Sequence, residues 1–191
     1  MAEKATTRDI VKITESAVKK LLEGVAISQK GTLRRINGLL RQLEIKNGNI
    51  IPNQENIRLL RMIRPELKSI VVDNAYKKRV DTYLGNFDRI KSETDKLFNS
   101  TLAGFNPNKQ VFKEVINSSI SLTKTSLLET GIDQNVIGPV IDILNNGITT
   151  GANISEMEET LRTVIIGDSQ RLGGLENTLL LFQYNKTWNH Q

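Results

Sequence analysis

The sequence predicts an all-α protein made of a long antiparallel helical hairpin followed by a smaller bundle of short helices. Two stretches carry this prediction. In each, apolar residues recur at spacings that alternate between four and three residues, the repeat of a helix that lays a narrow seam against another helix. The rest of the chain falls into shorter helical patterns separated by Gly, Asn and Pro, and no segment convincingly predicts a sheet.

Composition excludes several classes of protein. The chain has 191 residues, of which 25% are charged and 38% hydrophobic, and it contains no cysteine. Disulfides, thiolate zinc sites and cysteine nucleophiles are therefore excluded. No apolar run approaches the length of a membrane-spanning helix, so we expect no membrane role. The net charge of +5 is unevenly distributed, because residues 1–98 are strongly basic and residues 99–191 are mildly acidic.

The first long helix begins near Thr6 or Thr7, either of which can cap it. Gly24 and Gly31 each weaken a helix by about 1 kcal/mol relative to alanine, so we expect a bend, or a short break near residues 29–32. The seam of this helix comprises Leu22, Ala26, Gln29, Leu33, Ile36, Leu40 and Leu43.

Asn47-Gly48 ends the first helical pattern and allows two interpretations. Gly after Asn is a natural left-handed helix end, which favours a plain helix–loop–helix. The same dipeptide between isoleucines is also the strongest local signal for a tight β-hairpin. We rank the helix–loop–helix first because the flanking helical patterns are long, and we keep a two-stranded ribbon as the alternative.

The second long helical segment begins after Pro52, with Asn53 as its expected N-cap, and Pro65 is expected to kink or restart it. Because the loop at residues 47–53 is short, the two long helices should run antiparallel and bury their seams on each other. The second seam comprises Tyr76, Val80, Tyr83, Phe87, Ile90 and Leu97.

Turn-forming residues at 99–107 suggest a boundary between a basic hairpin, residues 1–98, and a short-helix lobe with an aromatic tail, residues 99–191. In the lobe we expect Gly131 to end one helix, Asp133 to cap the next, and Asn146-Gly147 to close it. Ser155 and Glu158 form a capping-box pattern before a helix that stops at Gly167. The tail residues Phe182, Tyr184 and Trp188 either pack on the lobe or bind a partner.

Catalytic and metal-binding chemistry finds little support in the residues. The single histidine, His190, lies next to the end of the chain, and the glutamates at 156–159 are explained by the helix dipole. We expect no enzyme activity, no cofactor and no metal site.

A basic patch is the better functional candidate. If the hairpin folds near residue 50, two sets of cations should come together there and could bind phosphates or an acidic protein. The alternative is a face that is simply solvated. The predicted patch comprises Arg34, Arg35, Arg41, Lys46, Arg58, Arg61, Arg64 and Lys68.

The order of these features resembles a known family. LEIKNGNIIPNQENIRLLRMIRPEL is followed by VDTYLGNFDRIKSETDKLF, and then by ETGIDQNVIGPVIDILNNGITTGANISEMEETLRTVIIGD and RLGGLEN. This succession is similar to the head-morphogenesis (MuF-like) minor head proteins of tailed bacteriophages, in the forms found in phages of Bacteroides-type hosts. The sequence departs from the family after Leu175-Glu176, where the usual C-terminal domain does not follow.

The resemblance implies a virion structural or assembly protein, made in the host cytoplasm and placed near the portal vertex. Its implied partners are the portal or neighbouring head and neck proteins, a second copy of itself, or both, and ejection with the genome is a further implication. A neck- or tail-associated ring protein is a related alternative. The residues themselves leave open a different function, a DNA-binding protein that uses the basic hairpin.

Overall fold

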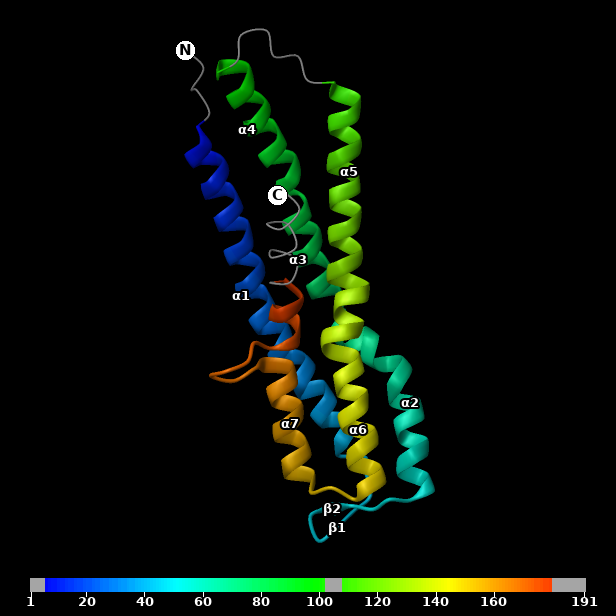
Figure 1. Ribbon diagram of the computed structural model, residues 1–191. Coiled ribbons are helices and arrows are strands. Elements are labelled where there is room, and N and C mark those ends of the chain that lie inside the picture. The colour runs from blue at the N-terminus through cyan, green and yellow to red at the C-terminus, as the bar shows by residue number, and fades with distance from the viewer. Residues whose placement is uncertain (1–5, 102–107, 180–191) are drawn as a thin grey trace.

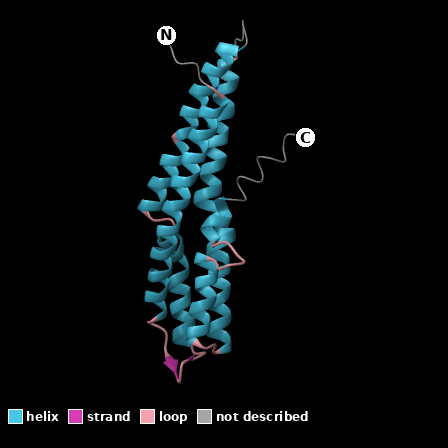
Figure 2. Ribbon diagram, turned by 90° about the vertical axis from the view of Figure 1, so that its left-hand side faces the viewer, coloured by secondary structure: helices cyan, strands magenta, loops and turns pink. Residues whose placement is uncertain are grey.

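A computed structural model describes residues 6–101 and 108–179 and confirms the all-α fold class. The described chain is helical apart from short connections and one two-stranded ribbon. Its helices run up and down a long axis (Figure 1). The molecule is correspondingly elongated when seen from the side (Figure 2).

Helix α1, Thr7–Leu40, begins with a capping box at Thr6. The Thr6 hydroxyl accepts from the Asp9 amide, and the Asp9 carboxylate accepts from the Thr6 amide at 2.9 Å. The Thr6 hydroxyl also donates to the Asp9 carboxylate at 2.6 Å, and this bond first, with the bond from the Thr6 amide second, lowers the pKa of Asp9. The helix continues through Gly24 and Gly31, so the break considered near residues 29–32 is not present. Packing of its buried side overrides the low helix propensity of the glycines.

The segment after α1 forms the two-stranded ribbon, the alternative interpretation of Asn47-Gly48, and the prediction of a plain helix–loop–helix is wrong. Strand β1, Ile45–Lys46, pairs antiparallel with β2, Asn49–Ile50. Asn47 and Gly48, with φ of 53° and 79°, supply the positive values that a two-residue hairpin turn requires. Consequently α1 ends at Leu40 rather than at Asn47-Gly48.

Docking of the ribbon explains why it forms from so few residues. The Ile50 amide donates to the Ala152 carbonyl at 3.0 Å, and the Ile154 amide donates to the Gly48 carbonyl at 2.9 Å. The Ile50 side chain is 1% exposed. The ribbon thus closes the lower end of the bundle against the connection between the last two helices in Figure 1.

The returning arm consists of three helices: α2 (Gln54–Val71), α3 (Asn74–Leu84) and α4 (Asn86–Thr101). Asn53 caps α2 as predicted. Pro65 does not restart the helix, because it lies on the exposed side of α2, where water can pair the carbonyl that loses its donor. The chain breaks instead before α3, which Asp73 caps, and at Gly85.

The third arm is one continuous helical rod from 109 to 150, and the predicted helix boundary at Gly131 and Asp133 is wrong. Helix α5, Lys109–Thr125, passes through two π-helical turns, η1 (Ser126–Thr130) and η2 (Asp133–Ile137), into α6 (Gly138–Thr150). The Gly131 amide donates to the Ser126 carbonyl, five residues back. A Cβ at Gly131 would lie 2.5 Å from Thr178 Cγ2, so glycine here permits close packing rather than ending the helix.

The predicted end at Asn146-Gly147 is also wrong. Helix α6 continues to Thr150 and ends at Gly151, whose φ of 68° is left-handed. Helix α7, Ile154–Ile166, follows, but Asn153 rather than Ser155 is its N-cap. Gly167 ends α7 as predicted, and the described chain finishes with a helical turn at 174–179.

The arms form two layers, with α1 and α2–α3–α4 in one and the 109–150 rod with α7 in the other. In the lower part α7 lies against α1 and α6 against α2, while in the upper part α1, α3, α4 and α5 meet (Figure 1). A hydrophobic cluster runs through the body and takes residues from both predicted segments, 1–98 and 99–191.

Both predicted seams lie at this packed side. In the first seam, Ile36 and Leu40 of α1 are buried, as is Leu43 just after the helix, and Leu22 and Leu33 are half-buried. The most buried row in the first half of α1 lies one residue earlier, at Ala17, Leu21 and Val25. Across from α1, Val80 and Phe87 are buried and Tyr83, Ile90 and Leu97 are half-buried.

Candidate functional site

The basic patch predicted near the hairpin is exposed, and two of its members form ion pairs with acidic residues of other elements. Arg61, Arg64 and Lys68 follow one line of α2, as their spacing requires. Lys68 Nζ lies 3.5 Å from the Asp133 carboxylate of η2, so the end of that line borders the 109–150 rod. All eight predicted residues are exposed: Arg34, Arg35, Arg41 and Lys46 on the α1 side, and Arg58, Arg61, Arg64 and Lys68 on α2.

Arg35 has a structural partner. Its Nη2 lies 2.7 Å from Asp73 Oδ2, and Asp73 Oδ1 also accepts from the Tyr76 amide at the start of α3. Burial opposes ionisation of Asp73, but the amide hydrogen bond and the Arg35 guanidinium outweigh it and lower the pKa of this carboxyl. Arg35 therefore helps to join α1 to the α2–α3 corner.

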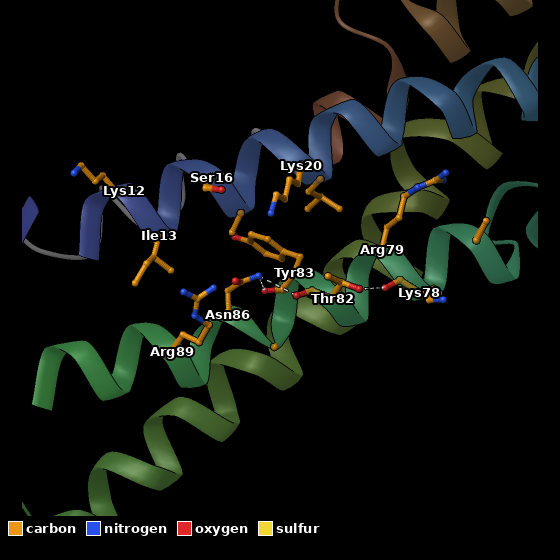
Figure 3. A pocket seen from close by; sticks show the side chains of 14 residues that line it. Lys12, Ile13, Ser16, Lys20, Lys78, Arg79, Thr82, Tyr83, Asn86 and Arg89 are labelled. Carbon is orange, nitrogen blue, oxygen red and sulfur yellow. Dashed lines mark hydrogen bonds between the residues drawn. The ribbon is translucent and has the colours of Figure 1, made fainter. Parts of the chain in front are cut away.

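A second basic surface lies in the upper half of the molecule, on segments that the sequence does not link. It is a groove of about 790 Å³ between the first half of α1 and the α3–α4 arm (Figure 3). Five cations line it: Lys12 and Lys20 from α1, Lys78 and Arg79 from α3, and Arg89 from α4. No acidic residue is among the described residues that line it. We call this surface the basic groove.

Local structure fixes how these cations sit. Lys12 and Lys20 are eight residues apart on a single helix, so both can face the α3–α4 arm. Arg79 instead crosses over α1, where its Nη1 donates to the Ser28 hydroxyl. A Cβ at Gly24 would lie 2.4 Å from Arg79 Cδ, so the missing side chain at Gly24 makes room for this crossing.

Neutral polar groups complete the basic groove. Ser16, Thr82, Tyr83 and Asn86 line it beside the cations (Figure 3). The Asn86 amide donates to the Thr82 carbonyl at 2.9 Å, which fixes its orientation. Burial raises the pKa of the Tyr83 hydroxyl, which therefore remains a neutral hydrogen-bond donor at physiological pH.

This set of side chains suits phosphate contact. Lys, Arg, Ser, Thr, Tyr and Asn are the residues that commonly bind phosphate oxygens in nucleic-acid complexes, where the bonds position the backbone without reading its sequence. The basic groove was missed at the level of sequence because its two walls are separated by more than 50 residues. The available signal was the excess of cations on both flanks, at residues 12–20 and 77–79.

A third surface feature is an apolar stripe on α5. Val111, Val115 and Leu122 are 53%, 55% and 70% exposed. Their spacings of four and seven residues place them on one line of the helix, away from its buried side at Thr123 and Leu127. We call these three residues the α5 stripe.

Other classes of site are less evident in the described parts of the chain. Residues 6–101 and 108–179 contain no group of three His, Cys, Asp or Glu side chains arranged to hold a metal ion. No helix within those ranges has the length and apolar character needed to cross a membrane. His190 and the predicted aromatic tail, Phe182, Tyr184 and Trp188, lie outside the described residues.

Comparison of the chain with protein-family models, with curated proteins and with solved structures gave no match. The resemblance to phage head-morphogenesis proteins therefore stays a prediction from the sequence.

Proposed function

We propose that this chain is a structural or assembly protein of a tailed-phage particle, a minor head protein that acts near the portal vertex through helix–helix contacts. The succession of sequence motifs supports the family. The elongated helical body suits a protein that works through its surfaces. Its partners would be the portal or adjacent head and neck proteins, or further copies of the chain.

The α5 stripe is the observation that supports helix–helix contact most directly. Large apolar side chains at i, i+4 and i+11 form the kind of face that one helix presents to another. Scattered exposed apolar residues are ordinary, but these three share one line of a single helix.

Incorporation into particles tests this proposal. Phage particles purified from host cells that carry the complete phage genome should contain the wild-type chain, as detected by mass spectrometry. A Val115→Asp/Leu122→Asp variant should be depleted at least tenfold, because contact would bury two unpaired charges. The matched control, Asn117→Asp/Ser121→Asp, adds the same charge to exposed positions off the stripe and should be incorporated normally. Absence of the wild-type chain from purified particles would refute the virion assignment.

DNA binding is the second candidate function, and the charge distribution of the described residues favours it. Arg58, Arg61 and Arg64 are exposed, and none of them forms an ion pair within the part of the chain that the structure describes. None of the five cations of the basic groove forms an ion pair within those residues either, and all of them except the half-buried Arg79 are exposed. If these groups neutralise phosphates, the logarithm of the duplex affinity should fall linearly with the logarithm of the salt concentration, with a slope of about −0.9 for each neutralised phosphate. A lack of duplex binding at low salt would remove this candidate.

A further inference from the structure

We infer that duplex DNA places its phosphate backbone in the basic groove between α1 and α3–α4, and not on the basic patch at the hairpin end. This inference rests on the DNA-binding candidate above and names the surface and the ligand group. It assigns a site that the sequence did not predict.

The electrostatics of the two surfaces differ. The basic groove gathers five cations from two antiparallel arms, and its described lining residues include no carboxylate. On the hairpin patch, Arg35 is paired with Asp73 and Lys68 with Asp133. Two walls that carry charge of the same sign also concentrate the electrostatic field between them more than a convex helix face does. The basic groove is therefore the stronger attractor for a polyanion.

Dimensions fit a stretch of phosphodiester backbone. At 1.5 Å per residue, Lys12 and Lys20 are separated by roughly 12 Å along α1, and Arg79 and Arg89 by roughly 15 Å along the other arm. One strand of duplex DNA carries a phosphate about every 3.4 Å along the helix axis. The basic groove thus spans about four phosphates of one strand, which is close to the number of cations that line it, five.

The floor of the basic groove argues against other acidic ligands. Single-stranded nucleic acid is usually held by stacking on exposed aromatic faces, but the half-buried Tyr83 ring packs edge-on against Phe87, with centroids 5.9 Å apart. An amphipathic acidic helix needs pockets for its apolar anchors, but Ala17 and Leu21 beneath the groove are only 6% and 5% exposed. A duplex needs neither feature, because its bases are already stacked.

Two charge-matched triple variants test the inference. The groove variant is Lys12→Gln/Lys20→Gln/Arg89→Gln, and the patch variant is Arg58→Gln/Arg61→Gln/Arg64→Gln. All six residues are exposed, and each variant removes three positive charges from a chain of net charge +5. Arg79 is left in place because it contacts Ser28 and its charge lowers the pKa of Asp73. Melting temperatures close to wild type confirm that both variants fold.

The measurement is fluorescence anisotropy with a labelled duplex of about three helical turns, over a salt series starting near 50 mM. The groove variant should lose at least tenfold in affinity at the lowest salt, and its salt slope should fall by about 2 to 3. The patch variant should stay within about threefold of wild type.

The outcomes separate failure of the inference from failure of the DNA-binding candidate. If the wild-type chain does not bind the duplex, the candidate fails and the inference fails with it. If the wild type binds but the patch variant loses more affinity, DNA binding stands and its assignment to the groove is wrong. Equal losses of duplex affinity in both variants would show an effect of net charge alone, and they would also overturn the assignment of DNA binding to the groove. Stronger competition by polyglutamate than by unlabelled duplex, per unit charge, would indicate an acidic protein as the ligand.

Discussion

Asn56 is the residue whose replacement should most directly test how the bundle is closed at its lower end. It lies in the first turn of α2 with its side chain 1% exposed. Its Oδ1 accepts from the Glu44 amide at 2.9 Å, and its Nδ2 donates to the carbonyls of Glu44 at 3.0 Å and Ile51 at 2.8 Å. One buried amide thus joins both ends of the ribbon segment to α2.

The cost of Asn56→Ala follows from these three bonds. Each contributes about 1 kcal/mol net, and their loss leaves the Glu44 amide without its partner, whereas the Glu44 and Ile51 carbonyls keep the Ile51 and Asn53 amides as donors. Alanine is the better helix former by about half a kcal/mol, which offsets part of the loss. We expect the free energy of unfolding to fall by about 2 to 3 kcal/mol. For a chain of this size that corresponds to a melting temperature lower by about 5 to 10 °C.

Thermal and urea unfolding followed by circular dichroism measure this change. Asn56→Asp is the discriminating variant, because the carboxylate has nearly the same shape but cannot donate to the two carbonyls. It should destabilise the protein at least as much as alanine at neutral pH, since it also buries a charge. Asn117→Ala, on the exposed side of α5, is the control and should lie within about 0.5 kcal/mol of wild type.

A small effect in both Asn56 variants would refute the reasoning. If Asn56→Ala and Asn117→Ala unfold at the same temperature, the ribbon is not held by this amide. If Asn56→Asp is as stable as wild type while Asn56→Ala is not, then shape rather than hydrogen bonding stabilises the contact.

Three further changes test other contacts. Tyr76→Phe removes the buried hydroxyl that donates to the main chain of η1 at 3.1 Å and should cost about 1 kcal/mol in urea unfolding, whereas Tyr83→Phe should cost almost nothing. Asp73→Asn keeps the cap of α3 but loses the charge pair with Arg35, which is partly exposed and worth under about 1 kcal/mol. The pKa of Asp73 is lowered below its ordinary 3.8, so the wild type should melt at a higher temperature than Asp73→Asn at neutral pH. This difference in melting temperature should vanish as the pH falls through the lowered pKa. A difference that grows in acid would contradict the reasoning. Phe87→Asp places a charge at a position 9% exposed and should cost about 3 to 5 kcal/mol or more, and an unchanged melting curve would show that the second seam does not hold the bundle.

Much of the secondary structure could be predicted because its causes are local. The Asn53 cap, the stop at Gly167 and the long helical periodicity depend on residues within a few positions of one another. The errors arose where a distant contact changed the balance. Glycine ends many helices. At Gly131, however, Thr178 packs against the glycine, and the Thr178 hydroxyl donates to the Gly131 carbonyl at 3.1 Å, so the helix continues through widened turns.

The candidate surfaces divide in the same way. The basic patch could be proposed from residues flanking one short turn, and the lines of cations on α2 follow from helical spacing. The basic groove could not be proposed from the sequence, because Lys20 and Arg89 come to line one surface only when α1 packs against α3 and α4. The α5 stripe shows the converse limitation. Its periodicity is visible in the sequence, but only the packed structure separates the exposed line at Val115 from the buried one at Thr123.

The sequence by itself determined that this protein is helical and where α1 and α2 begin, since helix propensity, capping and apolar periodicity act over one or two turns. The tertiary structure decided which turn-forming residues actually end a helix. It also decided the choice between loop and ribbon at Asn47-Gly48, because β1 and β2 are too short to be stable alone and are held by Ala152, Ile154 and Asn56. Packing energy between residues distant in sequence exceeds the fraction of a kcal/mol that separates such local alternatives, and no short-range pattern contains it.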